Sequence, residues 1–395
     1  MSKKTEWRET RVNLGGAILA SVATLIIGII IGTNWTNFSI YLGGTNKGKT
    51  TTIDWSPLNE VYSALSANYD GSFEKDDLIE GAKKGLVDAV GDIYTVYMNA
   101  EETNEFQKSL HGDVGAGVGV EMGLRDGYVR VIRTLPDNPA RKAGILAGDI
   151  IYKVNGEEVY NLSTEEVANK VRGESGSTVS VTIVRDGEEH TFEMVREMIN
   201  NVSAYTDYRD DSAIITVTRF DNDTGTMVMG FADEILNSGA NKIILDLRSN
   251  GGGYVSAARD LLSLWIDGKK ILTQKSLNSK DDITYALSGN AKFANIKTIV
   301  LVNNNTASAS EIVTGALKDY GKATIIGEKT YGKGVVQTLL NLSNATTLKV
   351  TTAHWYTPND LSINKTGIEP DVEIINTYED TNMSRDPQLD AALAY

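Results

Sequence analysis

The strongest constraint on the fold is the alternation of apolar strands with helices in the second half of the chain. Strands are predicted at residues 213–218, 242–247, 297–302 and 322–326, and helices at residues 227–237, 254–266 and 308–320. The segment KIILDL at 242–247 is almost continuously apolar, which is typical of a parallel strand buried on both faces. The alternation therefore predicts a βαβ core.

This pattern defines a core domain that we predict to span residues 198–375. Within it, residues 335–356 are typical of a β-meander on the same core. The last segment, 376–395, is rich in acidic residues and is predicted to be a tail that forms a surface appendage from Tyr378 onward.

Two smaller regions precede the core. Residues 111–197 are typical of short strands and turns. One helix is also predicted there, because Ser163 and Glu166 fit the capping-box pattern of a helix start. The segment RDGE at 185–188 marks a hairpin turn, so we predict a compact, mainly β domain. Residues 55–110 instead show apolar residues at helical spacing, which predicts a small helical region.

The N-terminal region contains an uncharged stretch at residues 14–32, close to the length that a bilayer core requires of a helix. Basic residues precede it, diluted by two glutamates, and their bias favours a cytoplasmic N-terminus. We therefore predict a cytoplasmic segment at 1–13, a signal anchor at 14–33 and a linker at 34–54. A cleaved signal peptide is the alternative, but no small-residue cleavage signature follows, and a buried core helix is disfavoured because the stretch has no polar face.

Charge and composition exclude several classes of protein. The net charge of −14 makes nucleic acid an unsuitable partner, because affinity for phosphate comes mainly from Lys and Arg. The absence of Cys excludes thiol nucleophiles, cysteine-ligated zinc and disulfide scaffolds, and it fits an extracytoplasmic bacterial setting. The histidines His111, His190 and His354 are not spaced like a metal-binding pair, so we expect neither a metal site nor a cofactor.

Two strand-to-helix junctions of the predicted core are candidate sites, because ligands gather at the carboxyl ends of parallel strands. The first contains three consecutive glycines, 251–253, which let backbone amides approach a ligand closely. The second contains TASASE at 306–311, where an exposed serine would lie beside free amides and the positive end of a helix. Taken alone, the first motif is more often a turn and the second more often a helix N-cap.

A serine nucleophile needs a base, and the next junction offers two lysines. Lys333 lies between Gly332 and Gly334, just ahead of an apolar strand. This position predicts partial desolvation, which lowers the pKa of a lysine from its usual value of about 10.4. Lys329 is typical of a solvated loop residue, as most lone lysines are.

Segment 327–333 also fits the phosphate-loop pattern G-x-x-x-x-G-K. Residue 334 is Gly, however, where that motif needs a Ser or Thr for Mg²⁺, and the following residues are typical of a strand. No G-x-S-x-G motif is present, which argues against an esterase-type Ser-His-Asp site. The phosphate-loop interpretation is therefore disfavoured.

The sequence resembles the carboxy-terminal processing peptidases, the S41 serine peptidases that combine a Ser/Lys dyad with an embedded PDZ domain. Four motifs carry the resemblance in the family's order: GVGV at 117–120, DLRSNGGG at 246–253, TASASE at 306–311 and TYGKGVVQ at 330–337. The likeness extends from about residue 55 to about residue 372. It implies an α+β or α/β multidomain fold: a βα peptidase core similar to crotonase and Clp protease sheets, an inserted PDZ domain, a helical cap and an N-terminal transmembrane helix.

The resemblance also implies roles for individual residues. Ser308 would be the nucleophile, in preference to Thr306 or Ser310. Lys333 would be the general base, and Gln337 would orient this lysine or shape its pocket.

The same motifs imply an oxyanion hole made of backbone amides. The amide of Ala309 would act with that of Gly253, and Gly252 is the alternative to Gly253. Gly251 stands where many relatives have Pro, which is a harmless exchange in a loop.

Together these expectations describe a membrane-anchored, extracytoplasmic serine endopeptidase that cleaves proteins near or from their C-termini. The PDZ segment at Gly117, Val118, Gly119 and Val120 would accept an extended peptide as an added strand and bind its carboxylate. Expected partners are proteins or peptides with accessible apolar C-termini and, through residues 14–33, the lipid bilayer; a homo-oligomer is compatible with this expectation. The alternatives are a catalytically silent PDZ adaptor at the membrane and a PDZ domain that merely packs against the core.

Overall fold

The computed structural model describes residues 53–125, 127–276, 280–377, 380 and 385–395. The predicted cytoplasmic segment, the predicted membrane anchor and nearly all of the predicted linker therefore lie outside the described residues. Within the described ranges, no helix combines the length and apolar character needed to cross a membrane. The chain divides into two units, residues 1–72 and 73–395.

The first unit contributes one described helix, α3 (Ser56–Asn68). Pro57 lies in its first turn, where a proline costs no intrahelical hydrogen bond. No residue of α3 is buried, and its apolar side chains, including Leu58, Val61 and Leu65, are exposed.

The second unit begins with helices α4 (Lys75–Asp88) and α5 (Ala100–His111), separated by the short strand β1 (Val96–Met98). Helix α5 starts at a capping box between Asn99 and Glu102 and ends at Gly112, whose φ is +70°. The helical pattern of the sequence is thus confirmed, but β1 was not expected, because a three-residue strand leaves almost no periodic signal.

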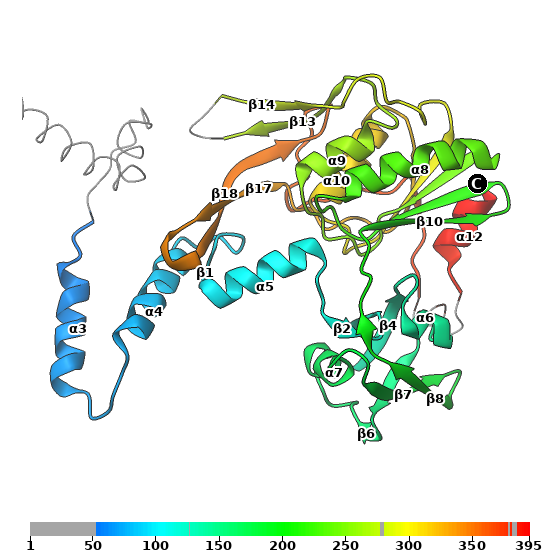
Figure 1. Cartoon of the computed structure of the whole chain (residues 1–395). Helices are drawn as coiled ribbons and strands as arrows, with labels where there is room; N and C mark the ends of the chain where they lie inside the picture. The colour runs from blue at the N-terminus through cyan, green and yellow to red at the C-terminus, as the bar shows by residue number, and fades with distance from the viewer. Residues whose placement is uncertain (1–52, 126, 277–279, 378–379, 381–384) are drawn as a thin grey trace, which may run out of the picture. The chain divides into compact units, whose positions relative to one another are not determined.

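Residues 116–198 form the predicted small β domain (Figure 1). Its six-stranded sheet has the order β3-β4-β5-β7-β8, with β6 paired to β5, and β3 lies at one edge. The elements are β2 (Ala116–Gly117), β3 (Val120–Arg125), β4 (Tyr128–Thr134), α6 (Pro139–Ala143), β5 (Ile150–Val154), β6 (Glu157–Glu158), α7 (Thr164–Val171), β7 (Thr178–Arg185), β8 (Glu188–Val195) and β9 (Glu197–Met198).

Two local predictions for this domain are confirmed. The capping box joins Ser163 and Glu166 at the start of α7, which buries Val167 and Val171. The β7–β8 hairpin turns at Asp186 and Gly187, both at positive φ. The short helix α6 was not anticipated; it starts with Pro at its first position and is too short to show a helical period.

The core domain is built on a six-stranded sheet of order β10-β11-β12-β15-β16-β19. All neighbours pair in parallel except β10 and β11, which are antiparallel. The predicted βαβ alternation is therefore confirmed, with ends that shift by a few residues. The strands are β10 (Ala204–Arg209), β11 (Ser212–Val217), β12 (Lys242–Asp246), β15 (Lys297–Val302), β16 (Thr324–Gly327) and β19 (Val372–Glu373).

Both faces of this sheet are covered. Alternate residues of β11 separate the faces: Ile215 and Val217 pack with α8 (Thr224–Ser238), α9 (Val255–Leu262) and α10 (Ala309–Asp319) (Figure 1). Ile214 instead belongs to the cluster on the opposite face, which α12 (Pro387–Ala394) covers with Leu389 and Ala392.

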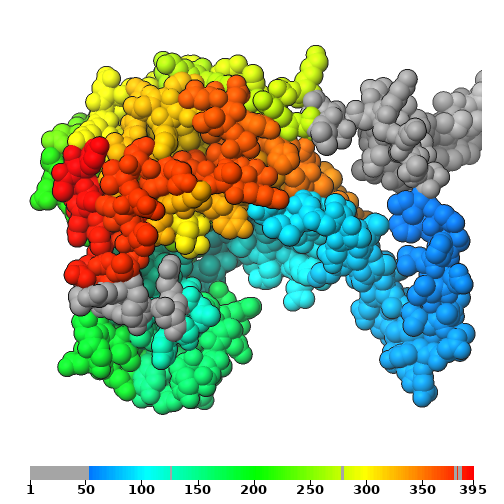
Figure 2. All heavy atoms as spheres, turned by 180° about the vertical axis from the view of Figure 1, so that it is seen from behind, coloured from blue at the N-terminus to red at the C-terminus, as the bar shows by residue number. Residues whose placement is uncertain are grey.

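The C-terminal segment therefore corrects a prediction. Residues 387–394 were expected in a surface appendage, yet Leu389 and Ala392 are buried, and α12 packs against β15 and β16. Figure 2 shows the C-terminal segment, in red, lying directly against the orange part of the core. The acidic residues of the segment lie mainly before the helix and on its outer side. The acidic composition therefore concealed two apolar residues three positions apart, Leu389 and Ala392, which share one face of the helix.

A second sheet, of five strands, pairs β1 with strands of the core domain. It has the order β1-β18-β13-β14 with β17 paired to β18, and every pair is antiparallel. The expected meander at 335–356 is the hairpin of β17 and β18, which belongs to this sheet and not to the parallel one. Its further elements are β13 (Lys270–Lys275), β14 (Asp282–Tyr285), β17 (Val335–Asn341), the 3₁₀ turn η1 (Ser343–Ala345) and β18 (Thr347–Tyr356).

Candidate active site

Ser308 occupies the N-cap position of α10, at the carboxyl end of β15. Its φ of 57° and ψ of −118° are costly for a residue with a Cβ, so the surrounding structure must hold it in place. Its side chain is partly exposed, whereas Thr306 and Ser310 are fully buried. Their hydroxyls donate to the carbonyls of Leu247 and Asn250, so both have structural partners.

The glycine loop that follows β12 lies directly against Ser308. A Cβ on Gly252, whose φ is +102°, would lie 2.7 Å from the Cβ of Ser308 and 2.9 Å from the amide nitrogen of Ala309. A Cβ on Gly253 would lie 2.1 Å from the carbonyl oxygen of Phe220. Only glycine fits at these two positions, because a side chain at 252 would clash with the serine turn and one at 253 would clash with the backbone of Phe220.

Asn250 fixes this loop to the serine turn. It is fully buried; its side chain donates to the carbonyl of Val217 and accepts from the amide of Gly252 at 2.9 Å. Its own carbonyl accepts from the amide of Ala307. The Gly252 amide already donates to the Asn250 side chain, so the Gly253 amide is better suited to donate a hydrogen bond to an oxyanion.

A carboxylate that the sequence analysis passed over lies at the centre of the site. Glu311 is fully buried, and one of its oxygens, Oε2, accepts hydrogen bonds from the backbone amides of both Ser308 and Lys333, each at 2.9 Å. The other, Oε1, accepts from the Thr330 hydroxyl at 2.6 Å and from the Gly332 amide at 2.7 Å. We call these five residues the Glu311 cluster.

The spacing of Ser308 and Glu311 would have been a usable signal. A Ser followed three residues later by Glu predicts a capping box at a helix start, in which the carboxylate accepts from the N-cap amide. The sequence could not show that the same carboxylate also accepts from the loop of Lys333.

Lys333 lies between two glycines that have no room for side chains. A Cβ on Gly334 would lie 2.7 Å from the backbone of Asn364, and Gly332 has a φ of +90°. The Nζ of Lys333 lies 5.3 Å from the centre of the Tyr94 ring. Burial lowers the pKa of the Lys333 amine, and the nearby charge of Lys349 lowers it further, while Glu311 opposes the shift.

The other candidate lysine is in a different environment. Lys329 is about half exposed and pairs with the exposed Glu369 at 2.6 Å. It therefore occupies the solvated loop position that the sequence predicts. The segment after these lysines is strand β17, not a helix, so the phosphate-loop interpretation lacks its helix.

Two further residues are relevant to Lys333: Gln337, four residues after it in β17, and Tyr94, whose ring lies beside the Lys333 amine. The amide nitrogen of Gln337 is buried and makes no hydrogen bond within the described part of the chain, which is unusual for a buried polar group. Tyr94, from the segment before β1, was missed by the sequence analysis. Its hydroxyl contacts that of Tyr331, and burial together with this hydrogen bond raises its pKa.

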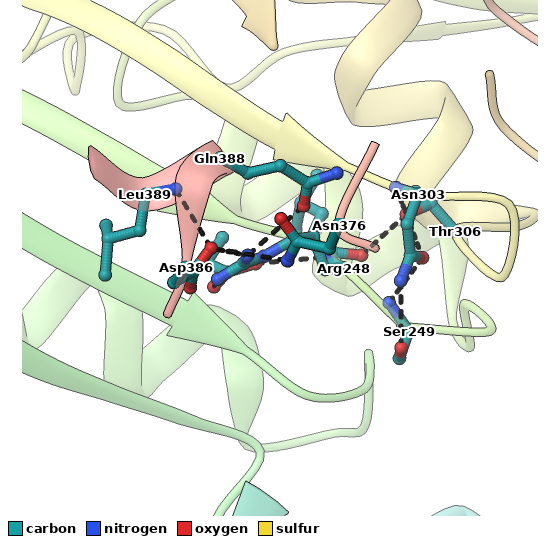
Figure 3. A network of polar contacts seen from close by, with 10 residues as sticks. Arg248, Ser249, Asn303, Thr306, Asn376, Asp386, Gln388 and Leu389 are labelled. Carbon is teal, nitrogen blue, oxygen red and sulfur yellow. Dashed lines mark hydrogen bonds and ion pairs between the residues drawn. The ribbon is translucent and has the colours of Figure 1, made fainter. Parts of the chain in front are cut away.

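A second, partly buried network lies next to the glycine loop (Figure 3). Arg248, directly after β12, pairs with Asp246 and with Asp386, each at 2.7 Å, and donates to the side chain of Gln388. Burial opposes the charge of Arg248, but the two carboxylates outweigh this and raise the pKa of the guanidinium. We call these four residues the Arg248 cluster; it attaches α12 to the segment that leads into the glycine loop.

The predicted peptide-binding segment lines a groove in the small β domain. The groove has a volume of about 630 Å³ and includes all four predicted residues, Gly117, Val118, Gly119 and Val120. On its other side lies α7, with Ala168 and Val171 among the lining residues.

Among the residues that the structure describes, no group of three or more His, Asp or Glu side chains is arranged to hold a metal ion. The Nδ1 of His111 donates to the carbonyl of Gln107, within its own helix.

Three models of known families match parts of the chain. Residues 211–374 match peptidase family S41, residues 116–195 match the PDZ domain, and residues 35–103 match a family described as the activating protease CtpB N-terminal domain. The matched ranges follow one another in the order that the sequence motifs suggested.

Comparisons with individual proteins agree with these family matches. A Staphylococcus epidermidis protein named "Probable CtpA-like serine protease" is 32% identical over 382 residues, covering 96% of this chain and 76% of that protein. A Staphylococcus aureus protein of the same name is 32% identical over 369 residues, covering 93% and 72%. The solved structure of the photosystem II D1 C-terminal processing protease is 27% identical with a TM-score of 0.55, covering 82% of this chain and 87% of that one.

Proposed function

The chain belongs to peptidase family S41 as a CtpA-like C-terminal processing serine protease with a PDZ domain, and from this premise we propose that Ser308 and Lys333 are its catalytic dyad. The observation that carries the proposal is the shared carboxylate oxygen of Glu311, to which the amides of both residues donate. Two residues far apart in the sequence are thereby held side by side.

The proposed reaction begins with neutral Lys333, whose amine takes the proton of the Ser308 hydroxyl. The serine oxygen then bonds to the scissile carbonyl carbon, and the amides of Ala309 and Gly253 donate to the oxyanion. As the carbon–nitrogen bond breaks, the proton passes from Lys333 to the leaving amine. Water then attacks the acyl-enzyme with Lys333 again as the base, and the serine hydroxyl is restored.

The environment of Lys333 supports this role. A lysine can accept a proton near neutral pH only if its pKa is well below that of a solvated ammonium. Burial and the charge of Lys349 act in that direction. Gln337, whose buried amide nitrogen makes no hydrogen bond to any residue that the structure describes, is suited to donate one to the neutral amine or to the substrate.

The PDZ domain is proposed to deliver substrates by their C-termini. Strand β3 lies at the edge of its sheet, so its outer backbone groups can pair with an extended peptide. The groove beside it is lined mainly by apolar side chains, which suits an apolar terminal residue. Substrates would accordingly be proteins with accessible, apolar C-termini.

The dyad is tested by proteolysis of an unfolded model protein with the full chain and its Ser308→Ala and Lys333→Met variants. We expect both variants to lose activity by at least about 10³-fold, as when one member of a catalytic unit is removed. Lys329→Met is the matched control and should retain full activity, because Lys329 is an exposed loop residue. Equal cleavage by all four proteins would eliminate the dyad; a chain that binds peptides but never cleaves them would instead be an adaptor.

We also propose that residues 14–33 anchor the enzyme in the cell membrane, with the catalytic part on the extracytoplasmic side. The support is the uncharged 14–32 stretch and the basic residues before it. The expected result is that the full chain resists alkaline extraction from membranes and is degraded by protease added outside spheroplasts. A chain released by alkali, or one protected from external protease, would contradict the anchor or its orientation.

A further inference from the structure

The groove of the PDZ domain has a chemical polarity along its length. It lies between the edge strand β3 and helix α7, and most of its lining residues are apolar. Its charged lining residues are Glu121, Glu165 and Arg172. Glu121 forms an ion pair with Arg133 of the neighbouring strand at 2.5 Å. Glu165 and Arg172 are therefore the charged residues of the groove that can interact with a bound peptide.

These two residues mark opposite ends of the groove. Arg172 follows the last residue of α7, and a Cβ placed on Gly117 would lie 3.9 Å from its Cγ. The C-terminal end of α7 therefore adjoins the glycine-containing loop. Glu165 is in the first turn of the same helix, seven residues earlier, which is about 10 Å along the helix axis.

The direction of a bound peptide follows from this arrangement. If its carboxylate lies at the loop of residues 117–119, the peptide runs back along β3, antiparallel to it. Extended residues advance about 3.3 Å each, so the residue two positions before the terminus lies about 7 Å along the groove, and a long Lys or Arg side chain at that position spans the rest of the 10 Å. Side chains alternate between faces, so the terminal side chain and the one two positions earlier both point toward α7.

The terminal side chain thus meets the end of the groove near Val171, and the side chain two positions earlier meets the first turn of α7. Glu165 is exposed there, and among the described residues it has no ion pair. Its neighbour Glu166 is occupied by the capping box with Ser163. The negative charge of Glu165 is accordingly available to a ligand.

We propose that Glu165 is a specificity residue of the groove, which selects polypeptides carrying Lys or Arg two positions before an apolar C-terminal residue. The inference rests on the proposed delivery of substrates by their C-termini and adds a second requirement to it. A basic residue at this position is attracted by Glu165, and an acidic residue is repelled by it.

The experiment uses the full chain carrying Ser308→Ala, so that bound peptides are not cleaved. Three fluorescent decapeptides end in the same apolar residue and differ only in having Lys, Gln or Glu two positions before it, and their dissociation constants are measured by fluorescence anisotropy. Exposed ion pairs contribute about 0.2–1 kcal/mol, so attraction against repulsion should separate the Lys and Glu peptides by about five- to tenfold. The separation should shrink in 0.5 M salt.

Glu165→Lys, added to the same background, is expected to reverse the order of the peptides. Glu188→Lys is the control, because Glu188 is an exposed residue of the same domain, in β8, outside the groove lining. It should leave the order unchanged. Equal binding of the three peptides, or the same order in Glu165→Lys as in its parent, would overturn the inference.

Amidated versions of the peptides separate this inference from the proposed function. If amidation abolishes binding but the three acids bind equally, recognition of C-termini stands and only the role of Glu165 is wrong. If amidated and free peptides bind alike, or no peptide binds, recognition of C-termini is itself wrong, and the inference falls with it.

Discussion

The Glu311 and Arg248 clusters are each organised around one charged residue, fully buried in the first and partly buried in the second, but they are built from different partners. Glu311 accepts mainly from backbone amides, three of its four hydrogen bonds, and these belong to two loops of the active site. Arg248 is neutralised by carboxylate side chains, one of them contributed by the segment before α12. In the first cluster, one carboxylate connects the backbones of two loops. In the second, ion pairs connect the side chains of two segments.

This difference determines what each cluster can control. Hydrogen bonds to backbone amides fix the course of the chain itself, so the Glu311 cluster sets the distance between the serine and lysine residues. Side-chain ion pairs fix which element packs where, so the Arg248 cluster holds the C-terminal helix on the sheet. Loss of the first should therefore reduce both catalysis and stability, whereas loss of the second should reduce stability with a smaller loss of catalysis.

Replacing Glu311 with Ala should have the largest effect. The change leaves three buried amides and the Thr330 hydroxyl without their acceptor, at about 1–3 kcal/mol for each unsatisfied group. We expect peptidase activity to fall at least about 10³-fold and the free energy of unfolding to fall by at least about 3 kcal/mol, measured by substrate cleavage and by urea unfolding.

Two further variants define the cause. Glu311→Gln keeps an acceptor oxygen and should recover part of the stability, whereas Glu369→Ala removes only an exposed carboxylate and should change neither quantity. Wild-type cleavage by Glu311→Ala would show that the cluster does not position the dyad.

Gly252→Ala should lower activity by about 10²-fold, the scale on which a single oxyanion donor acts. The new methyl group would be only 2.7 Å from the Cβ of Ser308, and the φ of +102° is unfavourable for Ala. Steady-state kinetics should show the loss mainly in kcat. Gly251→Ala is the matched control, since a Cβ there has no neighbour within 4 Å, and an equal loss in both variants would refute a local clash.

Asp386→Ala tests the Arg248 cluster. It removes one partner of Arg248 and also the side chain that accepts from the amide of Leu389 at the start of α12. We expect the free energy of unfolding to fall by about 2 kcal/mol, with a smaller loss of activity than for Glu311→Ala. Asp390→Ala, an exposed change in the same helix, should alter neither stability nor activity. If Asp386→Ala lost as much activity as Glu311→Ala, the Arg248 cluster would also position the dyad, and the proposed difference between the clusters would be wrong.

Lys349→Met should have the smallest effect, a shift in pH dependence. The charge of Lys349 lowers the pKa of Lys333, so its removal raises that pKa toward the ordinary value of 10.5. Because the neutral amine is the active form, kcat/KM rises with pH through this pKa, and the rise should move to higher pH. Lys329→Met should leave the profile in place, and a shift to lower pH in Lys349→Met would contradict the assigned sign.

The sequence was sufficient where a local pattern has a local cause. The apolar runs of β12 and β15 predict parallel strands, and the two glycines around Lys333 predict a constrained, partly buried lysine, as observed. The hydroxyl of Ser308 is likewise the one of three in its motif without a buried structural role. The catalytic roles themselves stay predictions, since geometry shows proximity and not turnover.

What the sequence could not supply comes from contacts between distant segments. Glu311 has a sufficient local explanation as a helix cap, so nothing in the sequence indicates its bonds to the loop of Lys333. Tyr94 reaches that lysine only because β1 pairs with β18. Helix α12 was hidden by its acidic surroundings, because two apolar side chains outweigh composition once a sheet face is available to them.

The backbone of Ser308 has a practical consequence for handling the enzyme. The φ of 57° is maintained only while hydrogen bonds hold the loops at 247–253 and 330–333 against the serine turn. If either loop becomes mobile, the turn can relax to an ordinary helix start. The Ser308 hydroxyl then leaves its catalytic position, although the sheets remain folded. On slow heating, cleavage should therefore cease several degrees before the circular dichroism signal changes, and cooling should restore it.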